Sequence, residues 1–162
     1  MPPAAMGREA FHVVLVDPEI PPNTGNVART CAATGTSLHL VGTLGFQLSD
    51  KYLKRAGLDY WEHVDLHYHP DLGALLEQQS AQRFVLTSAR RGVCLWDFAF
   101  QPGDWLVFGS ESRGLPEGLL SDERHPVVTI PLAEPAVRSL NLSNAVAVVL
   151  FESLRQLDPP SS

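Results

Sequence analysis

The sequence lacks the features that mark membrane, secreted and metal-binding proteins. No apolar run approaches the roughly 20 residues of a membrane-spanning helix, and no basic segment followed by an apolar one opens the chain. Cys31 and Cys94 have no CxxC partner, so neither a zinc site nor a disulfide framework is predicted. His67 and His69 have a spacing suited to chelation, but no Cys, Asp or Glu cluster completes a site. We therefore expect a cytoplasmic protein without a metal.

Positive charge is also scarce. Twelve Lys and Arg residues stand against 18 Asp and Glu, which gives a net charge of -6. This balance argues against a nucleic-acid partner, because phosphate binding depends on positive charge, but local clusters matter more than the net value. Lys51, Lys54 and Arg55 lie within about one helical turn, and Arg90 and Arg91 are adjacent. An ordinary solvated face explains these clusters equally well.

The familiar nucleotide and hydrolase signatures are missing as well. The chain has no GxGxxG after its first predicted strand and no GxxxxGK[ST], so neither a dinucleotide site nor a P-loop is supported. It has no GxSxG elbow, and Ser110 has no obvious His and Asp to activate it. The residues alone therefore favour an α/β enzyme or binding protein with an unusual polar site.

What the sequence contains is an alternation of apolar strands and helical patterns. Strands are predicted at 11–17, 37–42, 63–69, 83–88, 104–109 and 126–132, and helices at 23–35, 50–57, 70–79, 115–122 and from about 141. Pro70 is expected near the first turn of its helix. Such strands predict a mostly parallel sheet with helices on both faces. Residues 11–157 are interpreted as one domain between a flexible leader (1–10) and a tail (158–162).

Four polar segments stand at the expected carboxyl ends of strands: "PEIPPNTGNVAR", "TSARRG", "GSESRGLP" and "AEPAVRSLNLSN". Ligands of open parallel sheets bind outside these ends. The amides at Thr24 and Leu142, which open two helices, are expected to be free donors for an anionic group, and Arg29 is expected to clamp a phosphate. Singly, Gly109 and Gly114 are explained as turn residues and the asparagines as caps. Together, polar groups at one sheet edge favour a site.

Three of these segments, in order, resemble the motifs of the SpoU branch of the SPOUT methyltransferases: "NTGNVART", "LVFGSESRGLP" and "IPLAEPAVRSLNLSNAVAVVLFE". The segments "DPEIPPNTGN" and "DKYLKRAGLDYWE", with the short length, are similar to the tRNA (cytidine/uridine) wobble-position 2'-O-methyltransferases of that branch. The resemblance covers residues 11–157. One departure is Ser110, where relatives often carry Pro before Glu111, and it adds backbone freedom there.

The resemblance implies a C-terminal trefoil knot, S-adenosylmethionine as cofactor in a pocket made by the knot loops, and a homodimer that completes the active site. The expected reaction is 2'-O-methylation of the wobble nucleotide, a cytidine or modified uridine, in the tRNA anticodon loop. Two alternatives stay open. One is the same chemistry on rRNA or at another tRNA position, and the other is a non-catalytic RNA-binding factor on the same fold. No membrane partner is expected.

The same resemblance assigns site residues by position. Those matched to the cofactor are Leu86, Thr87, Gly109, Ile130, Leu132, Ser139 and Leu140, and those matched to the catalytic surroundings are Asn23, Arg29, Glu111 and Asn141. An adenine ring needs an apolar slot with main-chain partners, so Gly109→Val is expected to block it. Arg29 is expected to grip RNA phosphate, because a guanidinium is a poor base. Ser and Asn residues from 139 to 144 are expected to cap the last helix and face cofactor and ribose.

Overall fold

The computed structural model describes residues 10–47 and 58–157. The expected leader and tail, and the helix expected at 50–57 with Lys51, Lys54 and Arg55, lie outside the described residues apart from residue 10. The strands are β1 (His12–Val16), β2 (Ser37–Val41), β3 (Leu66–His69), β4 (Phe84–Thr87), β5 (Val93–Cys94), β6 (Trp105–Phe108) and β7 (Val127–Thr129). The helices are α1 (Pro21–Thr34), α3 (Leu72–Gln78), α4 (Glu117–Leu120) and α5 (Leu142–Leu157), with 3-10 turns η1 (Leu58–His63) and η2 (Leu95–Asp97).

The seven strands form one sheet in the order β3-β2-β1-β6-β4-β7-β5, and every neighbouring pair is parallel. The central strands β1 and β6 are apolar and almost completely buried. Strands of this kind need cover on both faces, because both rows of side chains avoid water. The structure confirms the predicted α/β class with a parallel sheet.

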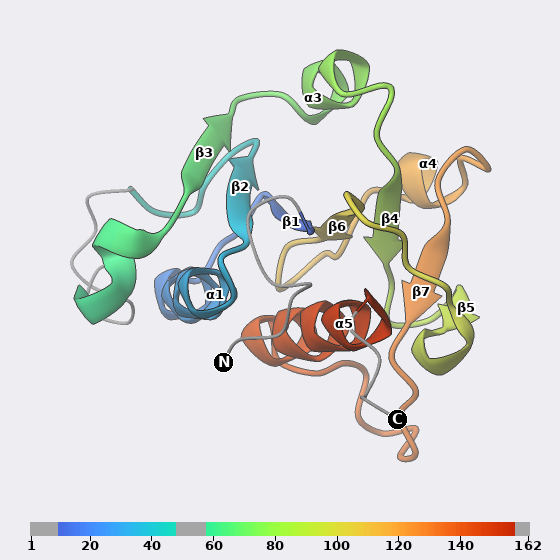
Figure 1. The fold of residues 1–162 in the computed structure, drawn as a ribbon. Helices are drawn as coiled ribbons and strands as arrows, with labels where there is room; N and C mark the ends of the chain where they lie inside the picture. Colours follow the sequence, from blue (N-terminus) through green and yellow to red (C-terminus); the bar gives the residue numbers. More distant parts are fainter. Residues whose placement is uncertain (1–9, 48–57, 158–162) are drawn as a thin grey trace.

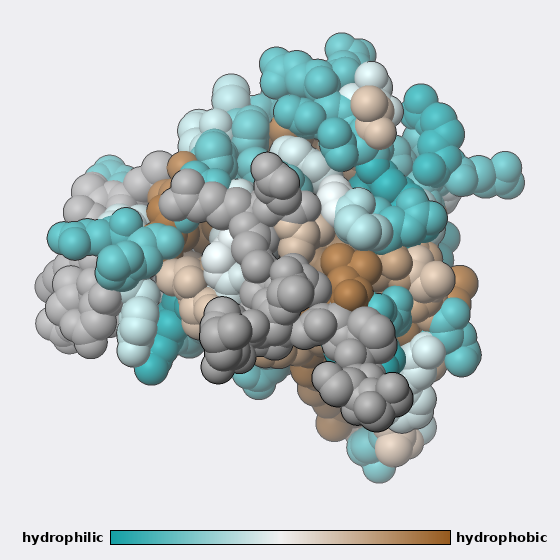
Figure 2. Space-filling model, viewed as in Figure 1, coloured by the Kyte–Doolittle hydropathy of each residue, from teal (hydrophilic) through white to brown (hydrophobic). Residues whose placement is uncertain are grey.

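Helices cover both faces of the sheet, as predicted (Figure 1). On one face α1 and α5 pack against each other and against a core that includes Val13, Val27 and Leu150. On the other face, apolar residues of α3 and α4 pack around a second core that includes Leu86 and Val107. Hydrophilic residues dominate the surface over α3 and α4, whereas hydrophobic residues gather near α5 (Figure 2).

The position of β7 is the unusual feature of the topology. It lies between β4 and β5, although it follows both of them in the sequence. The residues 88–92 that join β4 to β5 therefore cross β7, and a Cβ atom at Gly92 would lie 2.5 Å from the carbonyl oxygen of Val127. Gly92 also has a φ of +117°, which other residues rarely adopt. The trefoil knot itself stays a prediction from the resemblance.

Several local expectations need correction. The segment after β4 was expected to be a loop as far as residue 104, but it contains β5 and η2, and η1 precedes β3. Pro70 lies outside its helix, because Asp71 is the N-cap and its carboxylate accepts from the Ala74 amide at 3.0 Å. The helix expected to begin at Asn23 begins at Pro21, where proline fits the first turn, and ends at Thr34 with Gly35 as its C-cap.

A row of histidines crosses β1, β2 and β3 at one side of the sheet. His12 Nδ1 lies 3.0 Å from His39 Nε2, and His39 Nδ1 lies 3.0 Å from His69 Nε2. The His67 ring stacks on His39. Trp105 stacks on His12, with 4.2 Å between ring centroids, and lies against His39. We call His12, His39, His67 and His69 the histidine row, and Trp105 connects it to β6.

Candidate active site

Glu111 joins the loop after β6 to the loop after β1. Its Oε1 accepts from the Glu19 amide at 3.0 Å, and its Oε2 accepts from the Ile20 amide at 2.7 Å and from Asn23 Nδ2 at 3.3 Å. These amides immediately precede α1, where the helix dipole also favours a carboxylate. Three donors therefore fix the Glu111 side chain, and it in turn fixes the entry to α1.

Asn141 extends this network to the last helix. Its Nδ2 donates to Asn23 Oδ1 at 3.0 Å, and its Oδ1 accepts from the Ser143 amide at 2.9 Å and from Ser143 Oγ at 2.6 Å. Asn141 thus caps α5 and holds Asn23 at the same time. These two sets of hydrogen bonds explain why polar residues stand at the start of this apolar helix. Asn23, Glu111 and Asn141 are therefore brought together by direct hydrogen bonds.

Glu19 completes the link in the opposite direction. Its Oε1 accepts from the Ser112 amide at 3.1 Å and from Ser112 Oγ at 2.6 Å. These bonds lower the pKa of the Glu19 carboxyl, because they stabilise its charged form. Each of the two loops therefore offers a carboxylate to the backbone of the other. We call Glu19, Asn23, Glu111, Ser112, Asn141 and Ser143 the Glu111 cluster.

The expectation of a free donor at Thr24 was wrong. Because α1 begins at Pro21, the amides of Asn23 and Thr24 already bond to the Ile20 carbonyl, at 3.1 and 3.3 Å. The amides directed at an anionic group belong instead to Glu19 and Ile20, and that group is Glu111. The error came from treating Asn23 as the cap, whereas the backbone of Ile20 holds that position.

Arg29 lies apart from the Glu111 cluster. It is exposed on α1, its Nη2 donates to the Tyr60 hydroxyl at 3.4 Å, and its guanidinium carbon lies 4.7 Å from the centre of the Tyr60 ring. No carboxylate in the described part of the chain pairs with it within 4.0 Å. The guanidinium is thus oriented by an aromatic ring while its charge is left for another partner.

The residues assigned to the cofactor lie at the end of β4 or in the segments that follow its neighbours β6 and β7. Leu86 is buried in β4, and Thr87 Oγ1 donates to the Val107 carbonyl at 2.9 Å. Gly109 follows β6 directly. Ser139 is exposed and Leu140 partly buried in the segment that leads to α5.

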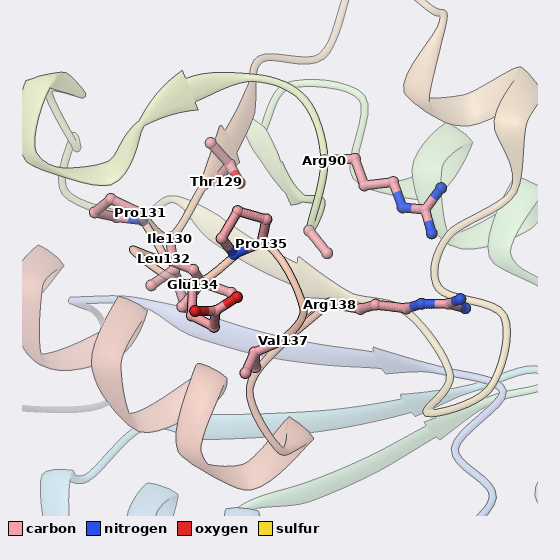
Figure 3. Close-up of a pocket in the computed structure, with 10 residues that line it drawn as sticks. Arg90, Thr129, Ile130, Pro131, Leu132, Glu134, Pro135, Val137 and Arg138 are labelled. Atoms are coloured by element: carbon pink, nitrogen blue, oxygen red, sulfur yellow. The ribbon is translucent and has the colours of Figure 1, made fainter.

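A pocket of about 460 Å³ lies beside these loops (Figure 3). It is lined by Ala89, Arg90, Thr129, Ile130, Pro131, Leu132, Glu134, Pro135, Val137 and Arg138. Ile130 and Leu132 were expected there. The wall is about equally polar and apolar, and its volume is typical of small-molecule sites, so the residues present fit a nucleoside cofactor, which has an apolar ring face and polar edges. Arg138, Glu134 and Pro135 stand in the polar segment after β7, but nothing in the sequence distinguished them as lining residues.

Gly109 also has a structural role in the turn that follows β6. A Cβ atom at this position would collide with the backbone of Gly114 and Leu115. A larger residue would therefore displace the turn that carries Glu111 and Ser112. The effect of Gly109→Val is expected to pass through that turn, in addition to any loss of cofactor space.

The family follows from the sequence as a whole. The model of the SpoU rRNA methylase family matches residues 10–151, which is most of the chain. The chain belongs to this SpoU family.

Relatives in the SpoU family match this chain along almost their whole length. A protein of Burkholderia ambifaria named tRNA (cytidine(34)-2'-O)-methyltransferase is 52% identical over 152 residues, which cover 90% of this chain and 95% of the relative. A protein of Acidovorax sp. with the same name is 49% identical over 159 residues, covering 93% and 96%.

Solved structures of SpoU proteins share the fold. One, described as giving insight into 2-OH methylation of C/U34 on tRNA, has a TM-score of 0.86 and 53% identity, and the match covers 91% of this chain and 95% of the other. AviRb of Streptomyces viridochromogenes, solved with AdoMet, has a TM-score of 0.80 and 28% identity, with 93% of this chain and 62% of AviRb covered.

Within the described ranges, no group of three or more His, Cys, Asp or Glu side chains is arranged to hold a metal ion, the histidine row included. Nor does any helix there have the length and apolarity to span a bilayer.

Proposed function

We propose that this protein methylates the ribose 2'-hydroxyl of the wobble nucleotide, position 34, of tRNA, where the base is a cytidine or a modified uridine. The observation that carries the proposal is the convergence of Asn23 in the first turn of α1, Glu111 after β6 and Asn141 at the start of α5. Asn141 follows the segment that lines the pocket. Two close relatives bear the name of this activity, and the similarity spans nearly the whole of each chain.

S-adenosylmethionine would supply the methyl group. The loops after β4, β6 and β7 would hold it through Leu86, Thr87, Gly109, Ile130, Leu132, Ser139 and Leu140. Ile130 and Leu132 support this assignment because they give the pocket apolar walls, which suit an adenine ring. The backbone amides and carbonyls of the same loops are available to its polar edge.

The catalytic task of this chain is to align the hydroxyl. Glu111 already accepts three hydrogen bonds, so we assign it to positioning and not to proton removal. Asn141 uses one Nδ2 hydrogen on Asn23, and its second hydrogen remains available to a ribose oxygen. Alignment of this kind contributes strongly to rate, because it replaces a random encounter by a fixed geometry. The proton passes to an RNA phosphate or to water.

Arg29 holds an RNA phosphate in this proposal. Its guanidinium lies over Tyr60 without a carboxylate partner among the described residues, so its charge is available. A guanidinium can bind phosphate through two parallel hydrogen bonds. Arg29→Ala is therefore expected to abolish most methyl transfer while leaving cofactor binding intact.

The deciding experiment uses labelled S-adenosylmethionine and tRNA from cells that lack this protein. The expected product carries label on the ribose of nucleotide 34, and mapping that nucleotide separates this activity from methylation of another tRNA position or of rRNA. Calorimetry with the cofactor tests the non-catalytic alternative, which requires RNA binding without cofactor affinity. Failure to label any tRNA would overturn the proposal.

We also propose a homodimer, as the family resemblance implies, that works in the cytoplasm. Val148 and Phe151 on α5 support a second copy as the partner, since these two apolar residues are 40% and 49% exposed. Covering such residues is favourable because it removes apolar area from water. Sedimentation should give a dimer, and Phe151→Glu should shift it toward monomer; a monomeric wild-type protein would contradict this part.

A further inference from the structure

The arginines of the described residues divide into two groups. Four pair with carboxylates: Arg83 with Asp104 at 2.7 Å, Arg124 with Asp122 at 2.6 Å, Arg155 with Glu152 at 2.8 Å, and Arg91 with Glu117. Arg29, Arg90, Arg113 and Arg138 have no carboxylate within 4.0 Å anywhere in 10–47 or 58–157. An unpaired guanidinium is a strong donor, so the position of the second group is informative.

The unpaired arginines all stand in the segments that follow strands of the central sheet. Arg90 follows β4, Arg113 follows β6 and Arg138 follows β7, while Arg29 lies on α1 after β1. Arg90, Arg113 and Arg138 are exposed. The paired arginines lie outside these loops, apart from Arg91. Because carboxyl ends of parallel strands meet at one sheet edge, three loops each bring one free guanidinium to the edge that carries the candidate site.

The direction of two of these side chains is visible in the pocket. Arg90 and Arg138 extend from different loops toward the same side of it (Figure 3). The Glu134 carboxylate lies on the opposite side, and its Oε1 accepts from the Ala136 amide at 2.9 Å. The acidic group of the pocket therefore does not neutralise the two guanidinium groups.

Arg113 has one acidic neighbour. The charge of Arg113 acts on Glu19, but as the smallest of the causes that lower the pKa of that carboxyl. Glu19 Oε1 is bound by the Ser112 amide and hydroxyl, so the carboxylate is already engaged within the loop. The positive charge of Arg113 is thus left largely uncompensated.

We propose that Arg90, Arg113 and Arg138 bind the sugar-phosphate backbone of the RNA substrate, one phosphate each. This inference rests on the proposed function for its partner. Arg113 and Arg138 lie within the matched motifs and Arg90 lies outside them, but the resemblance assigned no role to any of the three. It explains how a chain with a net charge of -6 holds RNA: local cations at one edge supply the attraction, while the other described arginines, apart from Arg29, are neutralised in pairs. Contacts to phosphate carry no base information, so they position the target nucleotide without selecting it.

The test measures tRNA affinity against salt for the full-length protein and for Arg90→Ala, Arg113→Ala and Arg138→Ala. Neutralising one phosphate contact should weaken binding at low salt and reduce the slope of log K against log salt by about 0.7 to 1. The corresponding Lys variants should keep most of the slope, because they keep the charge. Arg124→Ala and Arg155→Ala are matched controls, since these exposed arginines already bind carboxylates, and both should behave as wild type.

Cofactor affinity, measured by calorimetry on the same variants, separates the inference from the alternative that these arginines bind the cofactor. S-adenosylmethionine binding should be unchanged in Arg113→Ala, and in Arg90→Ala and Arg138→Ala, whose side chains line the pocket, it should fall by less than tRNA binding does. If Arg90→Ala or Arg138→Ala instead weakens cofactor binding with an unaltered salt slope, the arginines serve the cofactor and the inference is overturned.

The proposed function can fail independently. If the wild-type protein binds tRNA with an affinity that falls steeply with salt but methylates no nucleotide, the proposed function is contradicted. The arginine variants would then still test whether Arg90, Arg113 and Arg138 bind phosphate. Normal methylation with identical salt slopes in all three variants would remove the inference alone. A wild-type protein that binds no RNA would remove both.

Discussion

The Glu111 cluster and the histidine row are both hydrogen-bonded networks, but they are built from different parts of the fold. The histidine row lies on three adjacent strands, so the register of β1, β2 and β3 fixes its geometry. The Glu111 cluster joins loops that are about 90 and 30 residues apart in sequence, at positions 19–23, 111–112 and 141–143. The first network can serve the stability of the sheet, whereas the second holds loops in a shape that the sheet does not dictate.

Removing Glu111 should have the largest effect on activity and should break the Glu111 cluster alone. In Glu111→Ala the amides of Glu19 and Ile20 and the amide group of Asn23 lose their acceptor, so Asn23 and Asn141 shift. Misalignment of this kind costs about 100-fold or more in rate. Single-turnover methyl transfer measures it, with Glu77→Ala as control, since Glu77 is exposed on α3 and lines neither the cluster nor the pocket. Full activity in Glu111→Ala would show that the cluster does not align the substrate.

Acidification should act on the histidine row and weaken the fold. Burial, helped by the neighbouring imidazoles, lowers the pKa of His39 to about 3, and burial also lowers the pKa of His12 and His69. Below the ordinary histidine pKa of 6.5, the unfolded chain binds more protons at these positions than the folded protein does. The contribution of these histidines to the free energy of unfolding is therefore complete above pH 6.5 and declines as the pH falls. His39 alone contributes a slope of up to about 1.4 kcal/mol per pH unit.

Urea unfolding at about pH 7.5, 6.5 and 5.5 measures this decline. His39→Gln should show a shallower dependence on pH than wild type, because the buried titrating ring is gone. His63→Gln is the matched control, since His63 is exposed and lies outside the histidine row. A pH dependence that His39→Gln leaves unchanged would assign the effect to other groups.

Glu19 should matter less than Glu111, because its carboxylate holds an exposed loop. In Glu19→Ala the Ser112 amide and hydroxyl lose their acceptor, and methyl transfer is expected to fall by about five- to tenfold through looser alignment. Glu19→Gln keeps an oxygen acceptor and should lose less. A rise in the KM for tRNA or cofactor without a fall in kcat would argue against alignment as the role of Glu19.

The smallest effect is expected at Tyr60. Tyr60→Phe removes the 3.4 Å hydrogen bond to Arg29 but keeps the ring under the guanidinium, so activity should fall by no more than about threefold. Tyr60→Ala removes both contacts, so its activity should fall further, toward that of Arg29→Ala. Equal activity in Tyr60→Ala and wild type would show that Arg29 needs no support from this ring.

The sequence alone determined the elements that depend on local pattern. Apolar, β-branched runs predicted six of the seven strands, and β5, only two residues long, was missed because such a run is too short for a periodicity. The polar segments at strand ends marked the loops of the Glu111 cluster, and the resemblance supplied the roles proposed for Asn23, Arg29, Glu111 and Asn141.

Tertiary structure decided what local pattern cannot encode. The place of β7 between β4 and β5, the link of Glu19 to Ser112 and the diagonal contacts of the histidine row join residues far apart in the chain. Such contacts depend on which faces the helices cover and on strand order, which are set by packing over the whole domain. The sequence could therefore name the polar residues of the site, while only the fold decided which loops, and which free arginines, meet at one edge.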